Sequence, residues 1–221
     1  AVLDEPELAE ECAKTASRMN NHVPTPGGSK QGASMLALSG IVDPKEVNEK
    51  YLAPEGARGY STFFGYYLLQ AKALAGDFVG ALNDIREYWG AMLDLGATTF
   101  WEDFHTDWLK EDVAPITELV PAGKKDIHGD FGAYCYQGFR HSLCHGWASG
   151  PTAWLSQHVL GVEIVEPGYK VVKINPHLGD LEWVEGSVPT PFGDIRISHK
   201  KDADGKVVSK VDVPTGVTII M

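Results

Sequence analysis

The stretch STFFGYYLLQAKALAGDFVGALNDIREYWGAMLDLG, residues 61–96, decides the fold of this chain. Apolar side chains recur in it at intervals of three and four residues, first before and then after a short break at Gly76 and Asp77. This spacing predicts two long amphipathic α-helices, which must run antiparallel as a helical hairpin because the connection between them is so short. The apolar positions are Phe64, Tyr67, Leu68, Ala71 and Leu74 in the first helix and Phe78, Leu82, Ile85, Trp89 and Leu93 in the second.

Further helices are predicted on both sides of this hairpin. Asp43 offers a capping carboxylate, Pro44 stands at the first helical position and Glu46 follows three residues after the cap, which predicts a helix running towards Tyr51. Three more predicted helices span residues 5–18, 29–39 and 146–160. We therefore expect residues 1–166 to form a series of helical hairpins.

The period of the apolar pattern changes from 3.6 to 2 after residue 166. Short β-branched runs separated by turn residues follow, and Asp204 with Gly205 offers the dipeptide that a β-hairpin turn requires. The predicted strands cover residues 169–174, 181–184, 194–198, 207–213 and 217–220. The chain is thus predicted to be mainly α-helical, with a small antiparallel β domain over residues 167–221.

The composition limits the classes of partner. A chain of 221 residues with 43% apolar and 22% charged residues is typical of a folded globular protein. Its formal net charge of −11 argues against nucleic acid and against an anionic membrane surface, because phosphate binding depends on clustered Lys and Arg. No apolar run approaches the roughly 20 residues that a membrane-spanning helix needs. A neutral ligand fits this composition better.

The sequence does not assign a cellular compartment. Three cysteines, Cys12, Cys135 and Cys144, are too few for a disulfide framework, and they lack the CxxC spacing of a zinc site. The start AVLDEPELAEECAK shows neither a basic segment nor an apolar segment typical of an export signal. Periplasmic, secreted and cytoplasmic locations all stay open.

The stretch GATTFWEDFHTDW, residues 96–108, places acids and a histidine among large aromatic residues. Glu102 follows the predicted hairpin in a loop, where a carboxylate flanked by aromatics could take a proton from water or accept hydrogen bonds from sugar hydroxyls. The alternative is a glutamate that caps the next helix beside a core tryptophan. His105 and Asp107 invite a metal site, but no second histidine follows at ligand spacing, so we expect neither a metal nor another cofactor.

A second candidate stretch is SLCHGWASGPTAWL, residues 142–155. Cys144 and His145 are adjacent, yet a thiol nucleophile and its base are spatial rather than sequential neighbours, so thiol catalysis is disfavoured. The glycines of this stretch predict a tight entry into a helix, which would present His145 and Trp147 at its N-terminal end. A structural histidine that hydrogen-bonds the backbone is the alternative interpretation of His145.

Together, GATTFWEDF, SLCHGWASGPTAWL and EPGYKVVKINPHLGDLEWVEGSVPTPFG resemble, in this order, the C-terminal half of the bacterial α-L-rhamnosidases, glycoside hydrolase family 78. The resemblance covers residues 61–213. It implies that the helical hairpins are the C-terminal part of an (α/α)6 barrel and that the β domain is a small antiparallel β-sandwich. The rest of the barrel would have to lie elsewhere.

The same resemblance implies roles for four residues. Glu102 matches the glutamate proposed as general base in an inverting hydrolysis, His145 matches a histidine that lines the rhamnose subsite, and Trp101 and Trp147 would form apolar walls of the cleft. In the family, the catalytic acid lies well upstream in an acidic segment, which has no counterpart in this chain. We therefore expect a glycoside hydrolase acting on a rhamnose-containing glycoside or oligosaccharide, with the missing half supplied elsewhere, for instance by a second chain.

Two alternative functions assign no catalysis to these residues. A non-catalytic carbohydrate-binding fragment would explain both the aromatic residues and the missing acid. A helical interaction fragment would follow from the uncovered apolar face of a partial barrel, since exposed apolar patches of more than a few hundred Å² mark interaction surfaces. Binding of L-rhamnose without hydrolysis would favour the first, and a flat calorimetric titration would favour the second.

Overall fold

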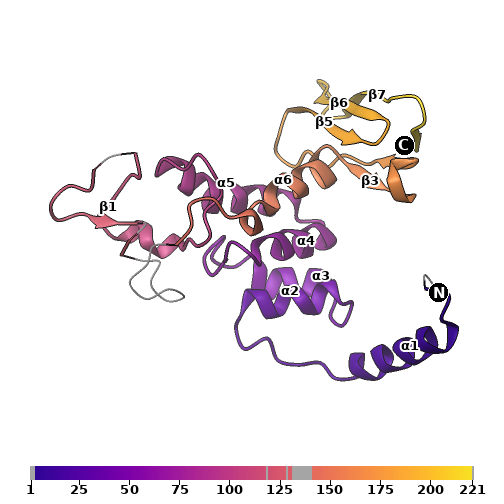
Figure 1. Cartoon of the computed structure of the whole chain (residues 1–221), viewed down its shortest axis with the longest axis horizontal. Helices are drawn as coiled ribbons and strands as arrows, with labels where there is room; N and C mark the ends of the chain where they lie inside the picture. The colour runs from indigo at the N-terminus through magenta and orange to yellow at the C-terminus, as the bar shows by residue number, and fades with distance from the viewer. Residues whose placement is uncertain (1–2, 118, 128, 131–140, 221) are drawn as a thin grey trace.

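The structure of the chain is a computed structural model that describes residues 3–117, 119–127, 129–130 and 141–220. A helical part comes first and a β-rich part follows, as Figure 1 shows. The predicted mainly helical fold with a β appendage is thereby confirmed. None of the helices in the described ranges is long and apolar enough to cross a membrane.

The predicted helices are present, with shifted ends. The α-helices are α1 (Pro6–Asn20), α2 (Lys30–Leu38), α3 (Pro44–Val47), α4 (Gly65–Ala75), α5 (Phe78–Asp94) and α6 (Gly150–Trp154). Shorter helices are the π-helical η1 (Asn48–Leu52) and η5 (Leu155–Val159) and the 3₁₀-helical η2 (Thr106–Lys110), η4 (Gly146–Ala148) and η6 (Pro167–Tyr169). The single helix expected over residues 146–160 is therefore η4, α6 and η5 in succession.

Local side chains account for the helix ends. The Asp43 carboxylate accepts hydrogen bonds from the first amides of α3, including Lys45 N–H at 2.9 Å. Between α4 and α5, Gly76 takes the left-handed conformation with φ of 81°, which favours glycine, and the Asp77 carboxylate accepts from Gly80 N–H at 2.9 Å. The predicted cap and the predicted break are both where the sequence places them.

Helix α4 lies at the centre of the helical part. It packs against α2, α3, α5 and α6, and its residues Leu68 and Leu69 are fully buried. Trp154 of α6 is also fully buried, and its indole Nε1–H donates to the Leu69 carbonyl at 3.0 Å. By contrast, α1 buries none of its residues and extends away from the other helices in Figure 1.

An ion pair is buried inside this helical core. Lys72 of α4 contacts the Asp84 carboxylate of α5, and the side chains are only 2% and 3% exposed. The Tyr60 hydroxyl donates to the same carboxylate at 2.5 Å, and Asp77 lies 3.8 Å from the Lys72 ammonium. Burial raises the pKa of Asp84 although Lys72 opposes the shift, and burial together with Asp84 raises the pKa of Tyr60 well above its ordinary value.

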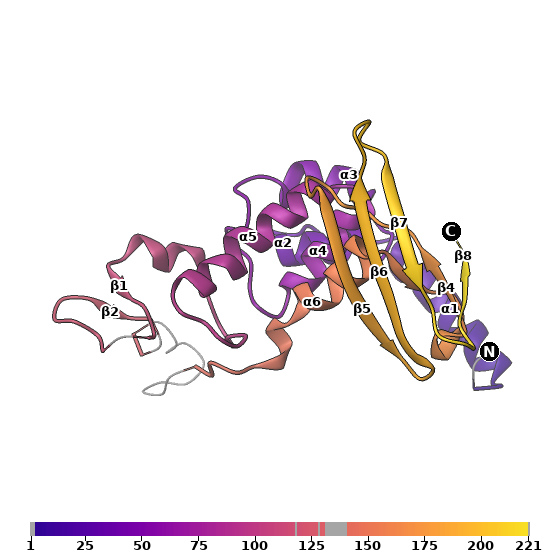
Figure 2. The same ribbon diagram turned by 90° about the horizontal axis from the view of Figure 1, so that it is seen from above.

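The β part contains two three-stranded sheets. One has the order β3 (Val162–Ile164), β4 (Val171–Ile174) and β8 (Thr218–Ile220), and the other has the order β5 (Trp183–Thr190), β6 (Gly193–Lys201) and β7 (Val207–Asp212). Figure 2 shows β5, β6 and β7 side by side. Strand β3 precedes the expected start of the β domain at residue 167. In the helical part, β1 (Val113–Ala114) and β2 (Lys125–Asp126) form a short parallel pair.

One pairing departs from the predicted antiparallel arrangement. Strands β5, β6 and β7 are antiparallel, as are β3 and β4, but β4 and β8 run parallel. The reason is that three strands intervene between β4 and β8, so the chain returns in the same direction instead of turning back at once. Apolar side chains from both sheets share one core, which includes Leu160, Val172, Ile174, Val188, Ile195 and Ile197.

Two histidines lie where the helical part meets the β part. The His177 ring stacks on Phe78 of α5, with centroids 3.9 Å apart. His158 of η5 shares a 2.9 Å hydrogen bond with the Gln70 side chain of α4, and its carbonyl accepts from His177 N–H at 2.9 Å. Burial is the main cause that lowers the pKa of both imidazoles below the ordinary value of 6.5.

The two histidines should make the stability of the chain depend on pH. Because the pKa of each imidazole is lower in the folded state than the unfolded value of 6.5, the folded chain binds these protons less readily than the unfolded chain. Their contribution to the free energy of unfolding is therefore full above about pH 6.5 and is lost as the pH falls through the lowered pKa values. Urea denaturation measured between pH 7.5 and pH 5, a range set on either side of roughly 6.5, tests this expectation.

Matched variants separate this effect from general acid denaturation. The double variant His158→Gln and His177→Gln should flatten the loss of stability over that range, whereas His22→Gln, at an exposed position, should leave it unchanged. A double variant with the same pH dependence as the original chain would contradict the assignment.

Candidate active site

Glu102 lies in the irregular segment that follows α5, and its side chain is 8% exposed. Two hydrogen bonds tie it to Ser142, forty positions further along the chain. The Glu102 backbone N–H donates to the Ser142 carbonyl at 2.8 Å, and the Ser142 backbone N–H donates to Glu102 Oε2 at 2.7 Å. A charge-assisted bond of this kind fixes the orientation of the carboxylate.

A second pair of bonds joins the same two segments. The His145 backbone N–H donates to the Phe100 carbonyl at 2.8 Å, and the Thr99 hydroxyl donates to the Leu143 carbonyl. Residues 99–102 and 142–145 therefore lie side by side. The structure thus brings together the two stretches that the sequence marks as candidates.

Two further hydrogen bonds hold the backbone of Glu102 in place. Its carbonyl accepts a hydrogen bond from the Thr62 hydroxyl and another from the Trp147 indole Nε1–H, the latter at 2.9 Å. Thr62 is 2% exposed and precedes α4, so the central helix of the fold positions the loop. Sequence reasoning missed Thr62 and Ser142, because no local pattern signals a partner forty residues away.

One carboxylate oxygen of Glu102 stays open. Within the described ranges, Ser142 donates to Oε2 and no residue donates to Oε1. A carboxylate with one fixed and one open oxygen is suited to bind and deprotonate a water molecule or to accept a hydrogen bond from a hydroxyl group.

His145 and Trp147 form a wall beside this carboxylate. Their ring centroids are 4.1 Å apart, and the Trp147 ring also packs on Phe63 at 5.7 Å. The Trp147 side chain is 45% exposed, whereas His145 Nδ1 is buried and has no hydrogen-bond partner among the described residues. The exposed indole can bind the apolar face of a sugar ring, whereas the buried Nδ1 of His145 is not accessible from solvent.

Trp101 is placed differently. It is fully buried and lies near Phe104 and His141, with ring centroids 6.1 and 6.4 Å away. Its indole Nε1 is buried and makes no hydrogen bond within the described part of the chain. In this structure, Trp101 supports the loop from inside and does not present a face to solvent.

The remaining candidates do not converge on a metal site. His105 Nδ1 accepts from Asp107 N–H at 3.2 Å, and Asp107 in turn pairs with Lys110 and, at 3.4 Å, with Arg58. The hydrogen bond from Lys110 is the main cause that lowers the pKa of Asp107, whereas burial raises the pKa of Asp103. No group of three or more His, Cys, Asp or Glu suited to a metal ion occurs among the described residues.

The two cysteines in the described part of the chain are free. Cys144 is exposed and unpaired, as is Cys12 in α1, and Cys135 lies outside the described residues. The Cys144 backbone N–H donates to the Ser142 hydroxyl at 3.1 Å, which places this residue in the turn that shapes the site.

Known sequences that are similar to this chain are α-L-rhamnosidases. Residues 161–221 match the family described as the bacterial alpha-L-rhamnosidase C-terminal domain. An alpha-L-rhamnosidase of Alteromonas sp. (strain LOR) is 33% identical over 131 residues, which make up 59% of this chain and 12% of that protein.

Solved structures of rhamnosidases also resemble this chain. The structure of the GH78 family rhamnosidase of Bacillus sp. GL1 matches with a TM-score of 0.65 and 26% identity over 86% of this chain and 18% of that chain. The α-L-rhamnosidase from Aspergillus terreus matches with a TM-score of 0.72 and 16% identity over 98% of this chain and 25% of that chain. The Streptomyces avermitilis enzyme complexed with L-rhamnose gives a TM-score of 0.64 and 17% identity over 87% of this chain and 18% of that chain. The chain thus spans a quarter or less of the length of these relatives.

Proposed function

We propose that this chain is a C-terminal portion of an α-L-rhamnosidase and that it supplies the general base and one wall of the sugar site for inverting hydrolysis of terminal α-L-rhamnosides. The observation that carries the proposal is the position of Glu102. Its carboxylate accepts a hydrogen bond from Ser142 N–H on Oε2, no described residue donates to Oε1, and the Trp147 indole donates to the backbone carbonyl of the same residue.

The proposed chemistry follows from these positions. A water molecule bound to Glu102 Oε1 attacks the anomeric carbon while the carboxylate takes its proton, and the bond from that carbon to the leaving-group oxygen breaks as this oxygen receives a proton from the second carboxylic acid. The Trp147 indole packs against the apolar face of the sugar, and the adjacent His145 ring helps to line the same subsite. Trp101 serves as an apolar support behind Glu102, since it is fully buried.

Inverting hydrolysis needs a second carboxylic acid on the other side of the sugar, with the two carboxyl groups roughly 6.5–9.5 Å apart. We assign that acid to the part of the enzyme that this chain does not contain, whether it belongs to the same polypeptide or to a second chain. Helix α1 buries none of its residues and supports this view, because its apolar side chains Leu8 and Met19 are 52% and 66% exposed. Helices in the remaining part of the enzyme would cover these two side chains.

The finer architecture is part of the same proposal. We take residues 1–166 as helical hairpins of an (α/α)6 barrel and residues 167–221 as the main part of a β-sandwich. The core shared by the two three-stranded sheets supports the sandwich, although β3 at residues 162–164 adds a strand before that boundary.

Proton NMR of the released sugar tests the proposal. The chain, together with the remaining part of the enzyme, is incubated with an aryl α-L-rhamnoside, and the anomeric signals are followed from the first minutes. Inversion predicts that β-L-rhamnose appears first and converts to the equilibrium mixture later. Early appearance of the α-anomer would overturn the inverting mechanism, and no release of rhamnose would overturn the hydrolase assignment.

A further inference from the structure

The outer face of the β5–β6–β7 sheet carries a second set of ligand-binding groups. Side chains alternate along each strand, so one face packs on the core through Val188, Ile195 and Ile197 while the other faces solvent. The register places the outer residues in three rows across the sheet. These rows are Trp183, Lys200 and Val208; Glu185, Ser198 and Lys210; and Ser187, Arg196 and Asp212.

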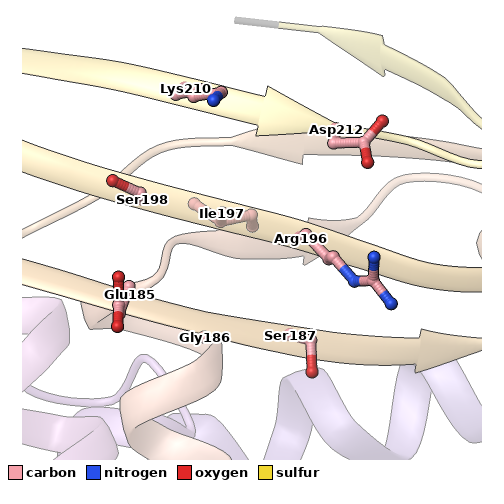
Figure 3. A pocket seen from close by; sticks show the side chains of 8 residues that line it. All are labelled: Glu185, Gly186, Ser187, Arg196, Ile197, Ser198, Lys210 and Asp212. Carbon is pink, nitrogen blue, oxygen red and sulfur yellow. The ribbon is translucent and has the colours of Figure 1, made fainter.

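Residues of these rows line two adjoining shallow depressions, together called the groove here, and Trp183 stands beside Lys200 in the register without lining either depression. A depression of about 570 Å³ lies over the second and third rows, and Figure 3 shows its polar side chains on all three strands. A neighbouring depression of about 290 Å³ continues over Lys200 and Val208 and shares Ser198 and Lys210 with the first. From the first row to the third, the groove extends roughly 13 Å along the strands, which is longer than one sugar ring.

The charged groups in this groove are not engaged with one another. Arg196 stands directly opposite Asp212 in the register, a position where opposite charges commonly pair. Nevertheless, Glu185, Arg196, Lys210 and Asp212 form no ion pair and no side-chain hydrogen bond with any described residue, and all four are exposed. Carboxylate acceptors therefore lie beside guanidinium and ammonium donors, with their hydrogen-bonding capacity open to a ligand.

An aromatic platform stands at one end of the groove. Trp183 begins β5 on the same face as Glu185, and its side chain is 60% exposed. An exposed indole offers a rigid apolar surface on which the C–H groups of a sugar ring can stack. The two requirements of saccharide binding, a stacking surface and mixed donors and acceptors, thus meet on one sheet face.

The balance of charge selects the kind of saccharide. The outer face contains the cations Arg196, Lys200 and Lys210 and the acids Glu185, Asp194 and Asp212, so it carries no net charge. We propose that this groove binds a neutral oligosaccharide that contains L-rhamnose, with Trp183 beneath one ring and the charged side chains bonded to hydroxyl groups. The class of ligand rests on the proposed function, but the site is separate from Glu102 and would hold substrate without cleaving it.

Heteronuclear NMR of the ¹⁵N-labelled chain, titrated with the neutral disaccharide rutinose, tests this site. We expect saturable shifts of the Trp183 indole N–H signal and of the amides of β5, β6 and β7. Trp183→Ala should weaken the binding measured at these amides about tenfold, as loss of about 1.4 kcal/mol of stacking would do. Arg196→Ala should weaken it in the same direction, and both substitutions lie at exposed positions where folding is little affected.

The controls keep this proposal separate from the catalytic one. Phe192→Ala removes an aromatic side chain that is 41% exposed in the same β part but does not line the groove, and it should leave the titration unchanged. Glu102→Gln should leave it unchanged as well, so binding can succeed even if the assignment of the base fails. Absence of saturable shifts in the sheet, or shifts that persist equally in Trp183→Ala and Arg196→Ala, would overturn the proposal.

Discussion

Replacement of Glu102 by glutamine in the proposed full-length rhamnosidase is expected to lower kcat by about 10²–10⁴-fold, the usual cost of losing a general base. Glutamine has nearly the same shape and keeps an oxygen that can accept the hydrogen bond from Ser142 N–H, so the loop should stay in place. What it loses is the ability to take a proton from water. Steady-state hydrolysis of an aryl α-L-rhamnoside measures the effect.

The neighbouring acid provides the matched control. Asp103 is half-buried beside Glu102 but has no place in the proposed proton transfer, so Asp103→Asn should retain most of the activity. An unchanged thermal midpoint for Glu102→Gln would show that the loss of activity does not arise from unfolding. If Glu102→Gln turned over substrate at nearly the original rate, Glu102 would not be the base.

The second large effect concerns stability. Asp84→Ala is expected to lower the free energy of unfolding by about 3–5 kcal/mol, the typical cost of leaving one partner of a buried ion pair uncompensated. Lys72 would keep only Asp77, which lies 3.8 Å from its ammonium group, and the Tyr60 hydroxyl would lose its acceptor. Urea denaturation of the chain measures the change in the free energy of unfolding.

An exposed ion pair between Arg86 of α5 and Asp180 serves as the comparison. Arg86 of α5 binds Asp180 through two bonds of 2.9 and 3.1 Å, but these side chains are 47% and 45% exposed. Asp180→Ala should therefore cost no more than about 1 kcal/mol. The double variant Asp84→Ala with Lys72→Met should recover part of the loss, because it removes the stranded charge as well. Equal losses for Asp84→Ala and Asp180→Ala would contradict the role given to burial.

The sequence predicts those parts of the fold that depend on near neighbours. The cap at Asp43, the break at Gly76 and the alternation along β6 and β7 are local patterns, and the structure confirms each of them, whereas β5 extends to Thr190, well beyond the strand predicted over residues 181–184. The parallel pairing of β4 with β8 is not local, and nothing in either strand specifies the direction of its partner. The sequence therefore predicts the elements better than their pairing.

The same division applies to the candidate site. The two aromatic stretches around Glu102 and His145 are visible in the sequence, but their contact through Ser142 is not, because it joins residues forty positions apart. Lys72 looks like a solvent-facing residue of an amphipathic helix, and only the packing of α4 among its neighbours buries it. Composition likewise cannot tell that Trp101 is fully buried while Trp147 is 45% exposed.

The four hydrogen bonds between residues 99–102 and 142–145 also limit which changes in the intervening segment can affect Glu102. They fasten both ends of the intervening polypeptide, so its outermost portion can change without displacing Glu102. Residues 119–125 in that portion are all exposed, and doubling the length of a flexible loop costs only about 0.6 kcal/mol in closure entropy. Insertions or exchanges of residues there are therefore expected to leave the position of Glu102 unchanged.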